Sequence, residues 1–151
     1  MEFVNYNANP KQLRTGDCVI RAISFALNKD YIETYKELVE IGISKCDLIN
    51  HKRIYELYLK NQGLDKQRMP RKENNSRYTV EEFINEKAEA NKTYIISLSK
   101  HLTVVVDKVL YDIWNCSSKK VGNYFELDTA VSVNQRELVK QKVRRNDRKR
   151  N

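Results

Sequence analysis

Cys18 is the residue whose setting best suits a nucleophile. It lies in residues 15–22 (TGDCVIRA), where an apolar helical pattern begins. The unpaired amides and the dipole at a helix start stabilise a thiolate, so the pKa of such a thiol falls. Gly16 leaves room for a substrate carbonyl to approach the backbone. We therefore expect Cys18 to be a reactive thiolate, the alternative being a small buried residue that opens a core helix. Cys46 and Cys116 lack such a position and are expected to be ordinary thiols.

His101 is the best candidate for the base that a thiol nucleophile requires. The chain has 2 histidines. His51 lies beside Lys52 and Arg53 at the polar start of a predicted helix, so we expect it to be a solvated surface residue. His101 precedes the apolar run of residues 102–106 and stands at the mouth of a predicted strand. The alternative interpretation of His101 is a half-exposed strand end.

An acidic residue on the next predicted strand completes this arrangement. If Asp107 and Lys108 form a two-residue turn, His101 and Asp112 lie on one face of the hairpin as diagonal neighbours, ~7–8 Å apart. Asp112 is then placed to orient the imidazole and to stabilise its charged form. Asn115 falls on the opposite face of a regular hairpin, and a bulge or longer turn would make it the third member instead. Alternatively, both residues merely end the strand.

The elements that must position these residues follow from hydrophobic periodicity. A nearly apolar helix is predicted from Cys18 to Leu27, with Asp17 or Thr15 placed to cap it. Further helices are predicted at about residues 31–41, 50–62 and 79–90, and strands at residues 94–98, 102–106, 109–114 and, more weakly, 124–127. Residues 1–16 are expected to be an extended lead-in. This order predicts an α+β domain, with N-terminal helices packed on a C-terminal antiparallel sheet.

Length and charge indicate one domain followed by a basic tail. The chain has 151 residues and a net charge of +8. Residues 134–151 hold eight basic and two acidic residues, which is 8 − 2 = +6 of that charge. We therefore expect a domain at residues 1–133 and a tail at 134–151. The tail could contact nucleic acid or an acidic protein, or simply solubilise the terminus. The candidate contacts are Arg144, Arg145, Arg148, Lys149 and Arg150.

Composition excludes several other classes of protein. The 3 cysteines form no Cys-x-x-Cys pair, and with 2 histidines they offer no zinc quartet. No Gly-rich phosphate loop is present, so we expect neither a metal nor an organic cofactor. No apolar run approaches the ~20 residues of a membrane span, and no secretory signal is visible. We expect reduced thiols and a cytoplasmic location, the host cytoplasm if a phage encodes the protein.

The order Cys18, His101, Asp112 resembles the papain-like cysteine peptidase superfamily. The segments GDCVIRA, HLTVVVD and YDIWN are similar to small uncharacterised phage and bacterial members, whose closest described relatives are bacteriocin-processing peptidases. The resemblance covers roughly residues 5–128, including a second helical block at 52–59. It implies a papain-like fold in which the nucleophile opens the central helix, and a Cys-His-Asp triad. It also implies that Gln12, six residues before the nucleophile, donates to the oxyanion.

This resemblance implies a thiol hydrolase that attacks an amide or ester carbonyl. Water as the final acceptor gives a peptidase or amidase acting on a peptide or protein, and an amine acceptor gives a transglutaminase-like enzyme. A papain-like binding module without catalysis, whose tail docks nucleic acid or an acidic protein, is the alternative. A structural phage component with a core cysteine is the third hypothesis.

Overall fold

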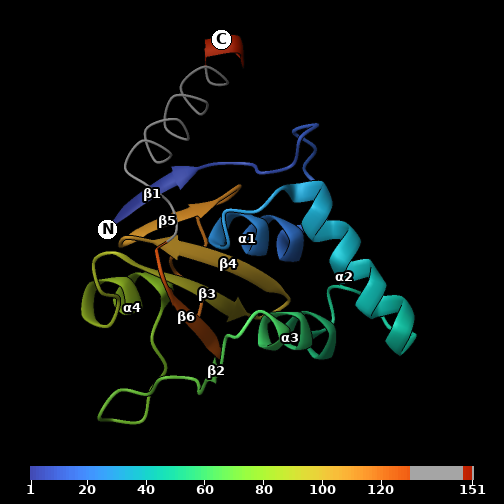
Figure 1. Ribbon diagram of the computed structural model, residues 1–151. Helices are drawn as coiled ribbons and strands as arrows, with labels where there is room; N and C mark the ends of the chain where they lie inside the picture. The colour runs from blue at the N-terminus through green and yellow to red at the C-terminus, as the bar shows by residue number, and fades with distance from the viewer. Residues whose placement is uncertain (130–147, 151) are drawn as a thin grey trace.

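The computed structural model describes residues 1–129 and 148–150, and its architecture is α+β around a six-stranded mixed sheet (Figure 1). The strand order is β1-β5-β4-β3-β6-β2. The strands are β1 (Glu2–Asn5), β2 (Lys66–Gln67), β3 (Lys92–Leu98), β4 (His101–Val106), β5 (Val109–Asp112) and β6 (Tyr124–Asp128). The named helices are α1 (Cys18–Ala26), α2 (Tyr31–Lys45), α3 (Lys52–Asn61) and α4 (Val80–Glu86). Within the described residues, no helix has both the length and the apolar character needed to cross a membrane.

The sheet departs from the expected antiparallel arrangement at one edge. Strands β3, β4, β5 and β6 pair antiparallel, but β1 pairs with β5 in parallel, with Glu2 opposite Val109 and Asn5 opposite Asp112. The expectation that residues 1–16 form only a lead-in was therefore wrong for the first strand. β1 is too short to show a period, and it forms because an edge strand offers unpaired N–H and C=O groups.

Two hydrophobic clusters cover the two faces of this sheet. Alternation along β3 and β4 sends Ile95 and Val104 to one face and Ile96 and Val105 to the other. The first cluster includes buried side chains of α1, α2 and α3, and the second includes those of α4. Figure 1 shows α1–α3 and α4 on different sides of the strands accordingly. The sheet is thus the middle layer, and α1 packs on one of its faces.

Helix α1 is the apolar central helix that the periodicity predicted. Its buried residues include Val19, Ile20 and Ile23, and it packs against β4. Asp17 stands at the N-cap position, but its side chain makes no capping hydrogen bond. The carboxylate of Asp17 is turned toward other partners at the site described below.

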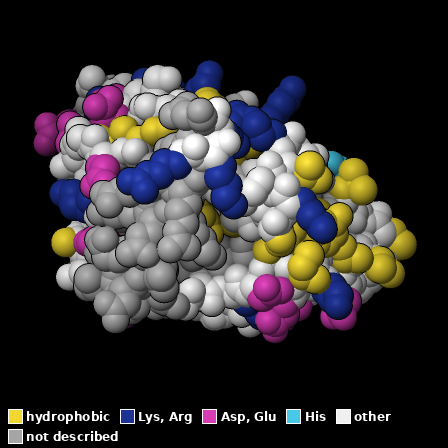
Figure 2. Space-filling view, turned by 90° about the horizontal axis from the view of Figure 1, so that it is seen from above, with side chains coloured by type: hydrophobic (Ala, Val, Ile, Leu, Met, Phe, Trp, Pro, Cys, Tyr) yellow, Lys and Arg dark blue, Asp and Glu magenta, His cyan; other side chains and the backbone are white. Residues whose placement is uncertain are grey.

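Helix α2 is longer than predicted and more exposed. It runs to Lys45 and ends at Cys46, whose φ of 52° is left-handed. Leu38 is buried, whereas Tyr35 is 43% exposed. Exposed apolar side chains gather over α2, on the right of Figure 2. They include Ile32, Tyr35 and Ile43.

The turn between β4 and β5 sets the register that the site needs. Asp107 and Lys108 form it with φ of 49° and 63°, and Val106 pairs with Val109. Two successive left-handed residues match the twist of a two-residue hairpin turn. The predicted two-residue turn is therefore confirmed, and with it the placement of His101 and Asp112 on one face.

Replacing Lys108 by Gly should raise the free energy of unfolding by about 0.5–1 kcal/mol. A non-glycine residue in the left-handed region is strained by about 1–2 kcal/mol, and Gly removes this strain. Gly also has more conformational freedom in the unfolded chain, which offsets about 0.5–1 kcal/mol of the gain. Urea unfolding measures the change. Lys108→Val should move the midpoint the other way, and a loss of stability in Lys108→Gly would contradict this account of the turn.

Candidate active site

Three elements bring Cys18, His101 and Asp112 to one end of the sheet. Because β4 and β5 run antiparallel, the first residue of β4 and the last residue of β5 lie at the same end. Cys18 is the first residue of α1, which packs against β4. The His101 Nε2 atom lies 2.6 Å from Asp112 Oδ2, and the Thr103 hydroxyl donates to the same oxygen at 2.7 Å.

Cys18 and His101 line the same hollow, and each shifts the pKa of the other. Burial raises the pKa of Cys18, but the interactions with His101, with the Leu102 backbone and with the Arg21 cation lower it by more, leaving the pKa below its ordinary value. Burial likewise opposes a charged His101, yet hydrogen bonds, chiefly to Asp112, raise its pKa to about 11. Between these two pKa values the pair is a thiolate and an imidazolium.

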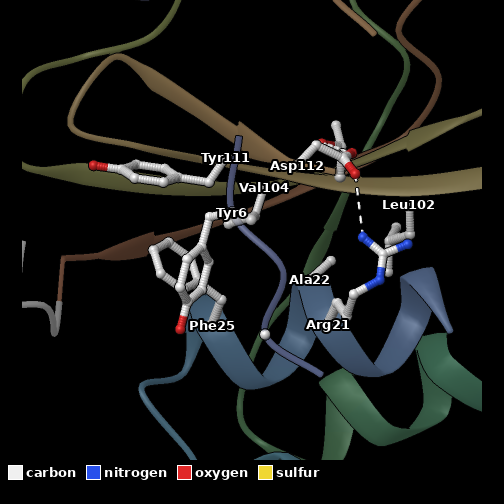
Figure 3. Close-up of a pocket in the computed structure, with 10 residues that line it drawn as sticks. Tyr6, Arg21, Ala22, Phe25, Leu102, Val104, Tyr111 and Asp112 are labelled. Atoms are coloured by element: carbon white, nitrogen blue, oxygen red, sulfur yellow. Dashed lines mark hydrogen bonds and ion pairs between the residues drawn. The ribbon is translucent and has the colours of Figure 1, made fainter. Parts of the chain in front are cut away.

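The Asp112 carboxylate is buried and accepts hydrogen bonds on both oxygens. Its Oδ1 atom accepts from Arg21 Nη1 at 3.2 Å and from the Ile113 amide at 2.7 Å. Burial raises the pKa of Asp112, but the His101, Thr103 and Ile113 interactions more than offset it and lower the pKa. Figure 3 shows Arg21 reaching from α1 toward Asp112 across a small cavity. The carboxylate is therefore ionised, and its Oδ2 is aimed at the imidazole.

Arg21 links Asp112 to a second buried carboxylate. Its Nε atom donates to Asp17 Oδ1 at 2.7 Å, and the side chains of Arg21 and Asp17 are 7% and 6% exposed. The other oxygen of Asp17 accepts from Tyr31 at 2.7 Å and from Asn9 at 3.0 Å. Sequence reasoning missed this network. Its available signal was the i, i+4 spacing of Asp17 and Arg21 on an otherwise apolar helix.

A hollow of about 560 Å³ opens beside the Cys18–His101 pair. Its apolar wall includes Val19, Leu98 and Leu102, and its rim includes residues from the start of α3. Gly16 also lines it, and a Cβ there would meet no atom within 4 Å. Cys18 therefore lies beside open space.

Gln12 and Asn115, the two remaining candidates, make hydrogen bonds elsewhere. The Gln12 side-chain amide donates to the Asn7 and Asn9 carbonyls at 3.0 and 2.9 Å, and Gln12 does not line the hollow. Asn115 is exposed, and its Oδ1 accepts from the Ser117 amide. The structure thus does not bring Gln12 or Asn115 to the Cys18–His101 pair.

Two further residues lie close to the His101–Asp112 pair. Cys116 is buried, with its Sγ atom 3.7 Å from Asp112 Oδ2. The ring of Trp114 lies 5.0 Å from that of His101, centroid to centroid, and Trp114 is 37% exposed. Trp114 therefore covers the imidazole on its outer side and does not fill the core.

His101, Asp112 and Cys116 also form a group whose potential metal-ligand atoms lie within 4.8 Å of one another. Two observations argue against assigning this group to a metal ion. The His101 Nε2 atom and Asp112 Oδ2 already share a short hydrogen bond, and the Arg21 cation lies next to the same carboxylate. A bound cation would have to break the first and approach the second, so we interpret the group as a proton-transfer arrangement.

The basic tail lies mostly outside the described residues. This applies to Arg144 and Arg145, and to the proposed boundary at residue 133. Arg148, Lys149 and Arg150 are described as helical and exposed. Their contact with nucleic acid or an acidic protein stays a prediction.

Comparison with known proteins adds no relative. No protein-family model, no curated protein and no solved structure matches the chain.

Replacing Arg21 by Met should lower the free energy of unfolding by about 3–5 kcal/mol, because Asp17 and Asp112 lose the buried guanidinium that they share. Lys29→Met is the control, since Lys29 pairs with Glu37 in a more exposed setting (23% and 32%), where a loss below about 1 kcal/mol is expected. In an Asp112→Asn background the cost of Arg21→Met should shrink. Urea unfolding of the four variants measures this, and equal losses in Arg21→Met and Lys29→Met would contradict the network.

Proposed function

We propose that this protein is a papain-like thiol hydrolase, most simply a cysteine peptidase or amidase. The observation that carries the proposal is the juxtaposition of the three residues: Cys18 and His101 line the same hollow and shift each other's pKa, and His101 Nε2 lies 2.6 Å from Asp112 Oδ2. The nucleophile opens an apolar helix packed on the sheet, and the histidine and acid lie on neighbouring antiparallel strands. The same order of residues carried the resemblance to papain-like enzymes in the sequence.

In the proposed reaction the Cys18 thiolate attacks the carbonyl carbon of a peptide or amide bond. The backbone N–H of Cys18, in the first turn of α1, has no intrahelical partner and can donate to the oxyanion. The His101 imidazolium then protonates the leaving amine, and the neutral imidazole activates the water that releases the acyl group. Asp112 holds the ring in position throughout. Gln12 could add a second oxyanion donor only if its side chain left the Asn7 and Asn9 carbonyls.

The pH dependence of alkylation tests the thiolate directly. Iodoacetamide should modify Cys18 faster than Cys46 at pH 6, because the lowered pKa of the Cys18 thiol leaves more of it ionised at that pH. His101→Gln should remove this advantage. Peptide mass spectrometry gives the rate at each cysteine. If Cys18 reacts like Cys46 at every pH, the nucleophile assignment is wrong.

Cleavage itself is tested with a peptide library derived from a bacterial proteome, incubated in water enriched in ¹⁸O. The wild-type protein should generate new carboxyl termini that carry ¹⁸O, whereas Cys18→Ala should generate none. Cys46→Ala is the matched control and should cleave like the wild type. Products that carry an added amine in place of ¹⁸O would show acyl transfer. Absence of both products would leave a binding module, the alternative function.

A binding module makes a different prediction for the tail. Its affinity for nucleic acid or an acidic protein would depend on Arg148, Lys149 and Arg150, which are exposed, and would fall steeply with salt. Cys18 would then serve only the core.

A further inference from the structure

The charges that line the hollow beside Cys18 have one sign. Its wall includes two lysines, Lys52 and Lys100, and two histidines, His51 and His101, and no Asp or Glu lines it. Lys52 is the first residue of α3, and Lys100 lies in the turn between β3 and β4 with φ of 55°. The two lysines therefore reach the hollow from different elements. No ion pair within residues 1–129 and 148–150 involves either one.

Asp47, which precedes α3 in the chain, is already paired with basic side chains. Asp47 lies 2.6 Å from His51 Nδ1 and forms an ion pair with Arg53. Asp47 lines a neighbouring hollow and not the one beside Cys18. These contacts weaken the effect of the Asp47 charge at the candidate active site.

Two helices also begin at this hollow. α1 starts at Cys18 and α3 starts at Lys52, and neither helix has an acidic residue in its first turn. The N-terminal ends of both helices add partial positive charge to that of the lysines. Behind this basic rim the wall is apolar, formed by Val19, Leu98 and Leu102 with Tyr55.

We propose that this hollow selects a substrate with a carboxylate close to the carbonyl that Cys18 attacks. This inference rests on the proposed function and names its substrate class: an acidic peptide, or a peptide cut next to its terminal carboxylate. Lys52 and Lys100 pair with the carboxylate, and the apolar wall packs against the substrate's carbon chain. Basic substrates are repelled by the same charges.

Two alkylating agents of nearly equal size test the charge preference. Iodoacetate carries a carboxylate and iodoacetamide does not. The rate with iodoacetate divided by the rate with iodoacetamide at one thiol therefore reports the local electrostatic potential. We expect this ratio at Cys18 to exceed the ratio at Cys46 in the same sample. Lys52→Gln and Lys100→Gln should each lower the Cys18 ratio about two- to fourfold at low salt, and together multiplicatively. Added NaCl should reduce the effect.

Lys60→Gln is the matched control, because Lys60 is exposed at the other end of α3. It should leave the ratio unchanged. The His101 charge favours iodoacetate in every variant, so the comparison among lysine variants isolates Lys52 and Lys100. A Cys18 ratio that neither variant alters would overturn the proposal.

Measuring the ratio at pH 9 as well separates this inference from the proposed function. At that pH an ordinary thiol is largely ionised, so the ratio still reports charge if the Cys18 thiol pKa is not lowered. Slow alkylation at pH 6 with a lysine-dependent ratio at pH 9 would overturn the enzyme but retain the carboxylate site. Fast alkylation at pH 6 with a lysine-independent ratio would do the reverse.

Matched peptides then distinguish the two carboxylate sources. One peptide carries an internal Glu and an amidated terminus, and the other carries Gln and a free terminal carboxylate. Selective competition by either against iodoacetamide alkylation of Cys18 identifies the source. Competition by neither, with a doubly neutral peptide as reference, would contradict the carboxylate preference.

Discussion

The burial of the Asp112 carboxylate is the constraint on which the rest of the structure depends. An ionised carboxylate away from water is stable only when its oxygens are hydrogen-bonded and its charge is compensated. Here Arg21 provides the compensating charge from α1, and Thr103 and the Ile113 amide provide further donors. His101 is hydrogen-bonded to the Oδ2 atom of the same carboxylate. The need to stabilise one buried carboxylate therefore fixes the positions of α1, β4 and β5 relative to one another.

This constraint also explains how one small domain can hold a charged pair at its surface. Asp112 raises the pKa of His101, and the imidazolium in turn lowers the pKa of Cys18. Each charge is stabilised by the preceding one, from the buried Asp17–Arg21 pair to the half-buried thiol. The charges therefore run from the buried carboxylates to the half-buried thiol that lines the hollow.

The hollow combines this reactive pair with an apolar wall and a basic rim. The wall derives from side chains that also form the core, such as Val19 and Leu102, so its shape is tied to the packing of α1 on β4. The rim derives from a turn and a helix start, Lys100 and Lys52, which carry little of the core. Charge at the rim can thus vary without disturbing the contacts among Cys18, His101 and Asp112.

The sequence by itself determined the α+β class, the central helix, the β4–β5 turn and the shared face of His101 and Asp112, because each depends on local periodicity or register. It could not locate β1, whose pairing with β5 depends on an open sheet edge 107 residues away in the chain (109 − 2 = 107). Nor could it reveal that Arg21 bridges Asp17 and Asp112, or that Lys52 and Lys100 line one hollow. Those contacts join residues from separate elements, and only tertiary packing decides which separate elements meet.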